Sequence, residues 1–225
     1  MLSQVILFPV IWGHTHDRKK EAIFRSMLDM RHILKRATDI GLSTFGLLVF
    51  GWAIVLCWVI AAIETRSNGF FLQRRVGRNG KLFRIIKIKT MYNKGLDQRS
   101  SVTSSTTSPI TRSGQVFRRF KLDELPQLIN VLKGDMSFVG PRPDVPGFAD
   151  KLEGNDRIIL SVRPGITGPA SLSFRNEEEI LAGVSDPETH NREVLWPAKV
   201  KLNLEYVRDF GFWSDMKYII KTVLR

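Results

Sequence analysis

The feature that most constrains this chain is an uninterrupted apolar run, IGLSTFGLLVFGWAIVLCWVIAAI, at residues 40–63. The run contains no charged residue, and about 20 apolar residues suffice for a helix to cross the hydrocarbon core of a bilayer. Few helices of water-soluble domains are apolar on every face over such a length, so a buried soluble helix is the weaker interpretation. The sequence therefore predicts a helix that enters a membrane.

Basic residues on both sides of this run bear on its topology. They are Arg18, Lys19, Lys20, Arg25, Arg31, Lys35 and Arg36 before the run, and Arg66, Arg74, Arg75, Arg78, Lys81 and Arg84 after it. Lys and Arg near a membrane helix mark its cytoplasmic side, and a helix that enters and returns to the same face satisfies this rule at both ends. We expect such a re-entrant helix, with its break at Gly46 or at the pair Gly51 and Trp52. The run holds no proline, so a plain transmembrane helix stays open as the alternative.

The charge balance narrows the class of partner. The formal net charge is +12, which indicates a polyanion: nucleic acid, an anionic membrane or a phosphorylated substrate. The cations gather beside the apolar run and the chain carries no nucleic-acid-binding motif, so we expect no nucleic-acid partner. Cys57 is the single cysteine, which excludes an intrachain disulfide and agrees with a reducing compartment.

The remainder of the chain predicts a mostly helical α/β fold with a small β-hairpin. Residues 70–91 form two short runs around an Arg-Asn-Gly-Lys turn, a pattern typical of a hairpin. The polar stretch SSVTSSTTS falls in residues 92–112, which we expect to form a mobile loop. Helical patterns follow at 191–208 and 212–224. The last of these helices lies either on the membrane interface or on the domain core.

The segment KLDELPQLINVLKGDMSFVGPRP, residues 121–143, carries the most chemical information. Its periodicity predicts one helix from Ser113 to Lys133, stopped by Gly134. The predicted core stripe is Leu122, Leu125, Ile129 and Leu132, and the predicted polar face is Arg119, Asp123, Gln127 and Asn130 with Glu124 beside it. Periodicity alone favours a solvated face with an Arg119–Asp123 pair, worth a few tenths of a kcal/mol.

Three features of this segment favour a reactive carboxylate instead. Arg118, Arg119 and Lys121 gather cations beside two acidic residues, which suits a phosphoryl group. Pro126 within a helix would remove a hydrogen bond and bend the backbone. Arg142 lies on a stiff turn between two prolines, and arginine suits bidentate phosphate binding. No P-loop, GxGxxG, HExxH or Asp-x-Asp signature accompanies them, although the acidic pair could bind Mg²⁺ together with substrate phosphates.

Four blocks of the chain resemble the bacterial sugar transferase family, the small monotopic phosphoglycosyl transferases that begin assembly of bacterial surface glycans. They are the KRxxD pattern at 35–39, QRRVGRNGKLFRIIKIKTM at 73–91, LDELPQLINVLKGDMSFVGPRP at 122–143 and RPGITGPASLSFR at 163–175. The resemblance covers roughly residues 33–225, and these blocks in this order are highly specific.

The resemblance implies a domain organisation. Residues 1–32 are then an N-terminal extension, 33–66 a re-entrant membrane helix, and 67–225 a compact cytosolic catalytic domain that lies on the membrane face and ends in interfacial helices. The implied location is the cytosolic face of the bacterial inner membrane. Where the family often has Ser-Pro at the membrane bend, this chain has Gly51 and Trp52; where the family often has Thr-Ser-Leu before its acidic pair, this chain has Phe-Lys-Leu.

The resemblance also implies a reaction: transfer of a sugar-1-phosphate from a UDP-sugar to polyprenyl (undecaprenyl) phosphate, with release of UMP, by a ping-pong route. Asp123 is then the nucleophile that forms an aspartyl-phosphosugar, and Glu124 a supporting acid/base. Mg²⁺, with Mn²⁺ as the alternative, is held by these two carboxylates and neutralises the diphosphate. The remaining site residues implied by the resemblance are Arg118, Arg142, Lys87, Lys89, Pro141 and Pro143.

The implied partners are the UDP-sugar, polyprenyl phosphate, an anionic phospholipid membrane, a second copy of the chain and downstream membrane glycosyltransferases. The sequence does not name the sugar, and we expect its specificity to lie in residues 144–200. The alternative function is a non-catalytic, membrane-anchored scaffold whose basic surface binds anionic lipid.

Overall fold

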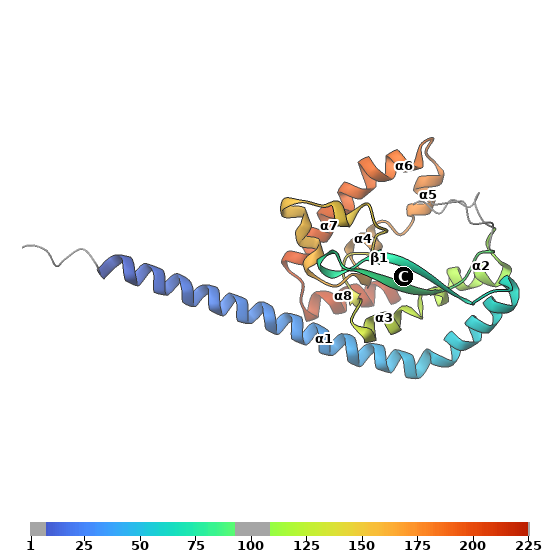
Figure 1. The fold of residues 1–225 in the computed structure, drawn as a ribbon, viewed down its shortest axis with the longest axis horizontal. Coiled ribbons are helices and arrows are strands. Elements are labelled where there is room, and N and C mark those ends of the chain that lie inside the picture. The colour runs from blue at the N-terminus through green and yellow to red at the C-terminus, as the bar shows by residue number, and fades with distance from the viewer. Residues whose placement is uncertain (1–7, 93–108, 225) are drawn as a thin grey trace, which may run out of the picture.

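The computed structural model describes residues 8–92 and 109–224, and it is mostly helical with two small two-stranded sheets. One long helix, α1 (Phe8–Thr65), reaches a compact domain, passes beneath it and bends there (Figure 1). The predicted mostly helical α/β class with a small hairpin is confirmed. The predicted mobile loop at 92–112 lies largely outside the described residues.

The apolar run remains helical throughout, including Gly51 and Trp52. The Ser43 hydroxyl donates to the carbonyls of Asp39 at 2.6 Å and Ile40 at 3.1 Å, and such back-bonding bends helices. Gly46, Gly51 and Trp52 all keep helical backbone, and the bend visible in Figure 1 does not interrupt it. The re-entrant topology, with its bend at Gly46 or at Gly51 and Trp52, stays a prediction.

The predicted hairpin is confirmed. Strands β1 (Phe70–Val76) and β2 (Leu82–Ile88) pair antiparallel in a register that runs from Phe70 opposite Ile88 to Val76 opposite Leu82. Asn79 and Gly80 take left-handed conformations, with φ of 58° and 76°, which asparagine and glycine tolerate best. The turn Arg78-Asn-Gly-Lys therefore sets the position of both strands.

The predicted single helix from 113 to 133 is wrong. The segment forms α2 (Arg112–Arg119), a 3₁₀ turn (Leu122–Glu124) and α3 (Gln127–Lys133). Lys121 has a φ of 55°, which ends the first helix. Pro126 stands just before α3, where its missing N–H is not needed.

The break also changes which side chains are buried. Asp123, Gln127 and Asn130 are buried, whereas Leu132 is exposed. The Asn130 side chain explains part of this, because its amide donates to the Arg84 carbonyl at 2.8 Å and accepts from the Ile86 N–H at 3.0 Å. The polar face of α3 thus fixes the helix against β2.

A second sheet, which the sequence did not predict, pairs β3 (Ser137–Val139) parallel to β4 (Gly165–Thr167). Glycine permits the close approach beside it: a β-carbon at Gly165 would lie 2.2 Å from the Gly140 nitrogen. The Pro-Arg-Pro turn follows Gly140 directly, so this contact fixes where the turn begins.

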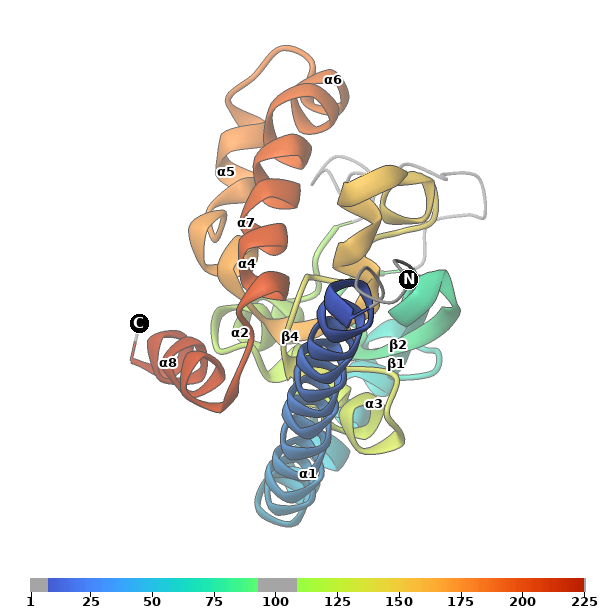
Figure 2. The same ribbon diagram turned by 90° about the vertical axis from the view of Figure 1, so that its left-hand side faces the viewer.

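The C-terminal part is helical. It contains short 3₁₀ segments at Ala149–Lys151 and Gly154–Ser161, helices α4 (Pro169–Ser173), α5 (Glu177–Ala182) and α6 (Pro187–His190), a π turn (Asn191–Leu195), α7 (Trp196–Arg208) and α8 (Phe212–Val223). The helices predicted at 191–208 and 212–224 are confirmed. Viewed along α1, α8 lies on one side of that helix, and α3 with the hairpin lies on the other (Figure 2).

Side chains of α1 attach it to the domain. Buried Lys35 donates to the Asp215 carboxylate on α8 at 2.5 Å and to the Val139 carbonyl at 2.8 Å. Arg36 donates to the Val131 and Leu132 carbonyls near the end of α3, at 2.6 and 2.8 Å. Basic residues at a helix C-terminus satisfy its last carbonyls. The KRxxD block is therefore a docking element between α1, α3 and α8.

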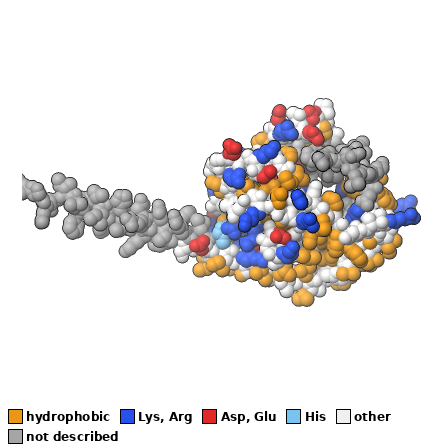
Figure 3. Space-filling view, viewed as in Figure 1, with side chains coloured by type: hydrophobic (Ala, Val, Ile, Leu, Met, Phe, Trp, Pro, Cys, Tyr) orange, Lys and Arg blue, Asp and Glu red, His pale blue; other side chains and the backbone are white. Residues whose placement is uncertain are grey.

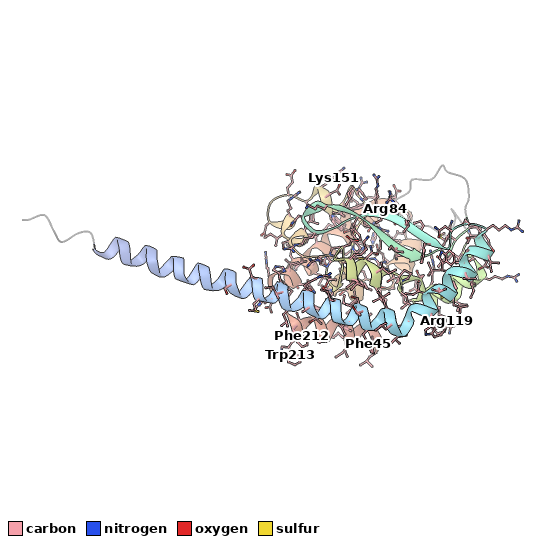
Figure 4. All side chains as sticks on the ribbon, turned by 60° about the horizontal axis from the view of Figure 1, so that its bottom comes forward. Phe45, Arg84, Arg119, Lys151, Phe212 and Trp213 are labelled. Atoms are coloured by element: carbon pink, nitrogen blue, oxygen red, sulfur yellow. The ribbon has the colours of Figure 1, made fainter. Side chains whose placement is uncertain are left out.

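One side of the molecule is rich in exposed apolar side chains. Orange surface follows the lower edge of the space-filling view, along α1, while basic side chains spread over the domain above it (Figure 3). Phe45 of α1 and Trp213 of α8 are 65% and 82% exposed. Phe45, Phe212 and Trp213 project on the same side, away from Lys151 and Arg84 (Figure 4).

Candidate active site

The acidic pair lies in the 3₁₀ turn between α2 and α3. The left-handed Lys121 and the helix start after Pro126 hold this turn beneath β2. The two carboxylates are adjacent in the chain but have unlike surroundings. Glu124 is in an ion-pair cluster, and Asp123 is buried beside it without an ion pair among the described residues.

Two cations reach Glu124. The Lys87 ammonium, on β2, donates to its carboxylate at 3.0 Å, and the Arg142 guanidinium lies 3.7 Å from the same oxygen. Burial by itself would raise the pKa of Glu124, but Lys87 and Arg142 outweigh it and bring the pKa down to about 2. Glu124 is therefore ionised at neutral pH and keeps both cations beside the turn.

Asp123 has the opposite electrostatic character. Its Oδ1 atom is buried and accepts no hydrogen bond from any residue that the structure describes. Burial, followed by the negative charge of Glu124, raises the pKa of Asp123, while Lys87, Lys121 and Arg118 oppose the rise. A carboxylate oxygen without a partner in a cationic, partly desolvated site suits a nucleophile toward phosphorus.

The cavity beside this pair is lined by Arg75, Lys87, Gln127 and Arg142, among others. The predicted residues Lys87 and Arg142 are thus brought together with the acidic turn. Pro141 and Pro143 are buried around Arg142, whose side chain is about half exposed. The two prolines hold the backbone of the turn, and the guanidinium projects from it toward Glu124.

The other two predicted cations make different contacts. Arg118 donates through Nε to the Thr90 hydroxyl at 3.0 Å and through Nη2 to the Met91 sulfur at 3.3 Å, near enough to Asp123 to lower its pKa. Lys89 donates to the Ser67 hydroxyl at 2.8 Å, next to the end of α1. Arg118 thus flanks the pair, whereas Lys89 points to the residues that follow the end of α1.

Two residues of the cavity region were missed from the sequence. From the sequence, Arg75 was only one of the many cations that flank the apolar run. Its position opposite Phe83 in the hairpin register places it on the side of the hairpin that faces the cavity. Asp144 directly follows Pro-Arg-Pro, and this adjacency was the one available signal. Burial raises the pKa of Asp144 to about 7, although Lys199, Arg75 and Arg142 oppose the rise.

The acidic turn can be tested for fit to a divalent cation. The described residues contain no group of three or more His, Cys, Asp or Glu side chains that could hold a metal. The unpartnered Asp123 oxygen beside the Glu124 carboxylate nevertheless offers hard oxygen donors, which Mg²⁺ prefers. The residues therefore fit a metal whose other ligands come from substrate phosphates and water.

Comparison with known proteins places the chain in a family. The family described as "Bacterial sugar transferase" matches residues 30–225. The UDP-N-acetylgalactosamine-undecaprenyl-phosphate N-acetylgalactosaminephosphotransferase of Aeromonas hydrophila is 28% identical over 99% of this chain and 50% of its own length. The UDP-glucose:undecaprenyl-phosphate glucose-1-phosphate transferase of Escherichia coli (strain K12) is 35% identical over 87% of this chain and 40% of its own length.

The chain therefore spans half or less of the length of these two relatives. A relative of similar size is the Bacillus subtilis (strain 168) protein described as uncharacterized sugar transferase EpsL, which is 33% identical over 85% of this chain and 86% of its own length. The family match extends from α1 to the end of α8 and includes the acidic turn, the hairpin and the Pro-Arg-Pro turn. The chain belongs to the bacterial sugar transferase family.

Proposed function

We propose that the chain transfers a sugar-1-phosphate from a UDP-sugar to polyprenyl phosphate and releases UMP, as the first step of a bacterial surface glycan. The observation that carries this proposal is the buried oxygen of Asp123, which has no hydrogen-bond partner among the described residues and lies beside the Glu124–Lys87–Arg142 cluster. The names of the Aeromonas and Escherichia relatives describe this class of transfer.

The reaction proceeds in two displacements at one phosphorus. The Asp123 carboxylate attacks the phosphorus that carries the sugar; a P–O bond to Asp123 forms, the P–O bond to UMP breaks, and UMP leaves with the electron pair. A phosphate oxygen of the polyprenyl phosphate then attacks the same phosphorus. The bond to Asp123 breaks, the carboxylate is regenerated, and a polyprenyl-diphospho-sugar leaves.

The charged residues around the turn stabilise the transferring group. Lys87, Arg142 and Arg118 supply fixed positive charge where the phosphoryl oxygens would lie, and such preorganised donors are a large part of catalysis of phosphoryl transfer. Glu124, with a pKa of about 2, holds these cations in place rather than giving up a proton. Bound Mg²⁺ would neutralise the diphosphate, with Asp123 and Glu124 as its protein ligands.

The proposed membrane topology is re-entrant. Lys35 and Asp39, before the apolar run, contact the domain, and so does Glu64 after it, whose carboxylate accepts from the backbone N–H groups of Arg112 and Ser113. A straight spanning helix of this length would separate those ends by roughly 35 Å. Attachment of both ends to one domain, with the bend between them (Figure 1), favours both ends on the same side. Reporters at the two ends that signal from opposite sides would exclude it.

Activity is tested by release of UMP from membranes given Mg²⁺, polyprenyl phosphate and a panel of UDP-sugars. We expect one or a few sugars to support release, and we expect Asp123→Asn to abolish it without loss of folding. The matched control is Asp156→Asn at an exposed position of the Gly154–Ser161 segment, which leaves release unchanged. An Asp123→Asn protein with full activity would overturn the mechanism. A wild type that releases no UMP from any UDP-sugar would instead leave the salt-sensitive lipid scaffold as the function.

A further inference from the structure

A second charged cluster lies next to the acidic turn and takes no part in the mechanism above. Asp144 follows the Pro-Arg-Pro turn, and Arg75 on β1, Lys199 on α7 and Glu177 on α5 are close enough to influence its ionisation. Lys199 and Glu177 form an ion pair of 2.5 Å with each other. Asp144 and Arg75, by contrast, both keep side-chain polar atoms without a hydrogen-bond partner among the described residues.

Arg75 is held in place but incompletely paired. Its Nη1 donates to the Pro143 carbonyl at 3.2 Å and its Nη2 donates to the Gln73 side chain at 2.6 Å. Its Nε is buried and has no hydrogen-bond partner among the described residues. The guanidinium lines the same cavity as Lys87 and Arg142. Each Nη atom has a second N–H that makes no hydrogen bond among the described residues, so a ligand in this cavity can accept from the guanidinium.

Asp144 is likewise held by its backbone, while its side chain has no partner among the described residues. Its carbonyl accepts from the Val76 N–H at 2.9 Å, which ties it to the strand that carries Arg75. Within the described part of the chain, its carboxylate makes no hydrogen bond and no ion pair within 4.0 Å. Burial nevertheless raises its pKa to about 7, and the residue before it, Pro143, lines the same cavity as Arg75.

The pair has the chemistry of a hydroxyl-binding site. A carboxylate accepts from hydroxyl groups and a guanidinium donates to them, so a carboxylate and a guanidinium that are near but not paired with each other can hold two neighbouring hydroxyls between them. A phosphate would be attracted by Arg75 but repelled by Asp144, and Lys87, Arg118 and Arg142 already provide for the phosphates of the donor. We propose that Asp144 and Arg75 bind a vicinal pair of hydroxyls of the nucleotide-sugar donor, an inference that rests on the proposed function.

The test measures steady-state UMP release by the full chain in lipid nanodiscs, with the UDP-sugar that the wild type uses. We expect Asp144→Asn, which keeps the size of the side chain, and Arg75→Lys, which keeps the charge, each to raise the KM for the donor about tenfold, as expected for one lost charge-assisted hydrogen bond. The KM for polyprenyl phosphate stays within twofold of the wild-type value. The matched controls Asp156→Asn and Arg74→Lys, both at exposed positions, leave both constants unchanged.

Two diols are present in the donor, and analogues distinguish them. If the pair binds the transferred sugar, a donor that lacks one sugar hydroxyl binds the wild type weakly, Asp144→Asn adds no further loss, and inhibition by UMP is the same in both proteins. If it binds the ribose, the 2′-deoxyuridine donor shows that pattern instead, and the inhibition constant of UMP rises with the donor KM. Either pattern supports the proposal.

Two results overturn it. Donor KM values within twofold of wild type in both variants would show that neither side chain binds the donor. Equal losses for donor and acceptor would show a general disturbance of the site; should Asp144→Asn fail to fold, Arg75→Lys decides alone. If the wild type releases no UMP from any UDP-sugar, the proposed function is wrong, and so is this inference. If the wild type is active and the variants are unaffected, only this inference is wrong.

Discussion

At the scale of single residues, two neighbouring carboxylates differ because of what reaches them. Glu124 has Lys87 at 3.0 Å and Arg142 at 3.7 Å, whereas Asp123 shares the burial without those contacts. The environment therefore lowers one pKa and raises the other. Pairs of titratable groups whose pKa values are pushed apart commonly divide their roles, and the proposed mechanism assigns the reactive role to Asp123.

The acid side of the pH profile should report Asp123. Its ionised form is the nucleophile, so kcat/KM falls as pH falls through its pKa, which burial and then Glu124 raise above the ordinary value of 3.8. Glu124→Gln removes the neighbouring negative charge and leaves Lys87 and Arg142 to act on Asp123. Both changes lower the pKa of Asp123, so we expect the acid limb to move to lower pH. The measurement is the rate at which the phosphosugar adduct forms at low donor concentration, followed by intact mass at each pH. An acid limb that moves to higher pH in Glu124→Gln would contradict the assignment.

At the scale of elements, the glycines beside β3 and β4 hold the Pro-Arg-Pro turn in place. A β-carbon at Gly165 would lie 2.2 Å from the Gly140 nitrogen, a backbone atom that cannot move aside cheaply. We expect Gly165→Ala to destabilise the domain by about 2 kcal/mol or more, as overpacking against backbone does. The measurement is thermal unfolding in detergent. Gly41→Ala on α1, where a β-carbon meets nothing within 4 Å, is the matched control and should be neutral or stabilising by up to about 1 kcal/mol. Equal unfolding temperatures for the two variants would contradict this close approach.

The attachment of α1 to α8 depends on a buried ion pair. Lys35 lies 2.5 Å from Asp215, and both side chains are less than 10% exposed. Lys35→Met leaves Asp215 charged, buried and unpaired, and breaking a buried pair in this way costs about 3–5 kcal/mol. Arg31→Met removes the exposed pair with Asp209, 3.8 Å apart, and should cost less than about 1 kcal/mol. Adding Asp215→Leu to Lys35→Met should recover most of the loss; a Lys35→Met protein as stable as Arg31→Met would show that the pair is dispensable.

The elements also show how far the sequence could predict this fold. The hairpin and the last two helices follow from local signals: a turn with asparagine and glycine, and helical periodicity. The helix predicted at 113–133 was wrong because a left-handed Lys121 and Pro126 divide it, and its periodicity could not show which face β2 would cover. The β3–β4 pairing and the Lys35–Asp215 contact join residues far apart in the chain, the latter 180 positions apart, and no local pattern indicates such contacts.

The candidate site shows the same division. The acidic turn, Lys87 and Arg142 were predicted from sequence blocks, and the structure brings them together. Arg75 and Asp144 were missed because their meeting depends on the hairpin register and on the Val76–Asp144 backbone hydrogen bond. Metal binding and the roles assigned to the individual residues stay predictions.

At the scale of the whole molecule, α8 combines the two alternatives left open by its sequence. One face packs on the domain through Asp215, Tyr218 and Ile219, and the other exposes Trp213, Ile220 and Val223. The exposed face projects on the same side as Phe45 of α1 (Figure 4). An amphipathic helix beside a helix long and apolar enough to cross a membrane suits the headgroup region of a bilayer, where the proposed lipid-linked acceptor would present its phosphate to the acidic turn.

This arrangement predicts which face of the molecule contacts lipid. Single cysteines introduced in a Cys57→Ser background at Trp213 and Phe45, and carrying an environment-sensitive fluorophore, should report an apolar medium in nanodiscs and be quenched by brominated lipid. The matched control is a cysteine at Lys151, which projects from the other side (Figure 4) and should report water and respond to an aqueous quencher. A position-213 label as accessible to the aqueous quencher as the one at 151 would separate α8 from the membrane.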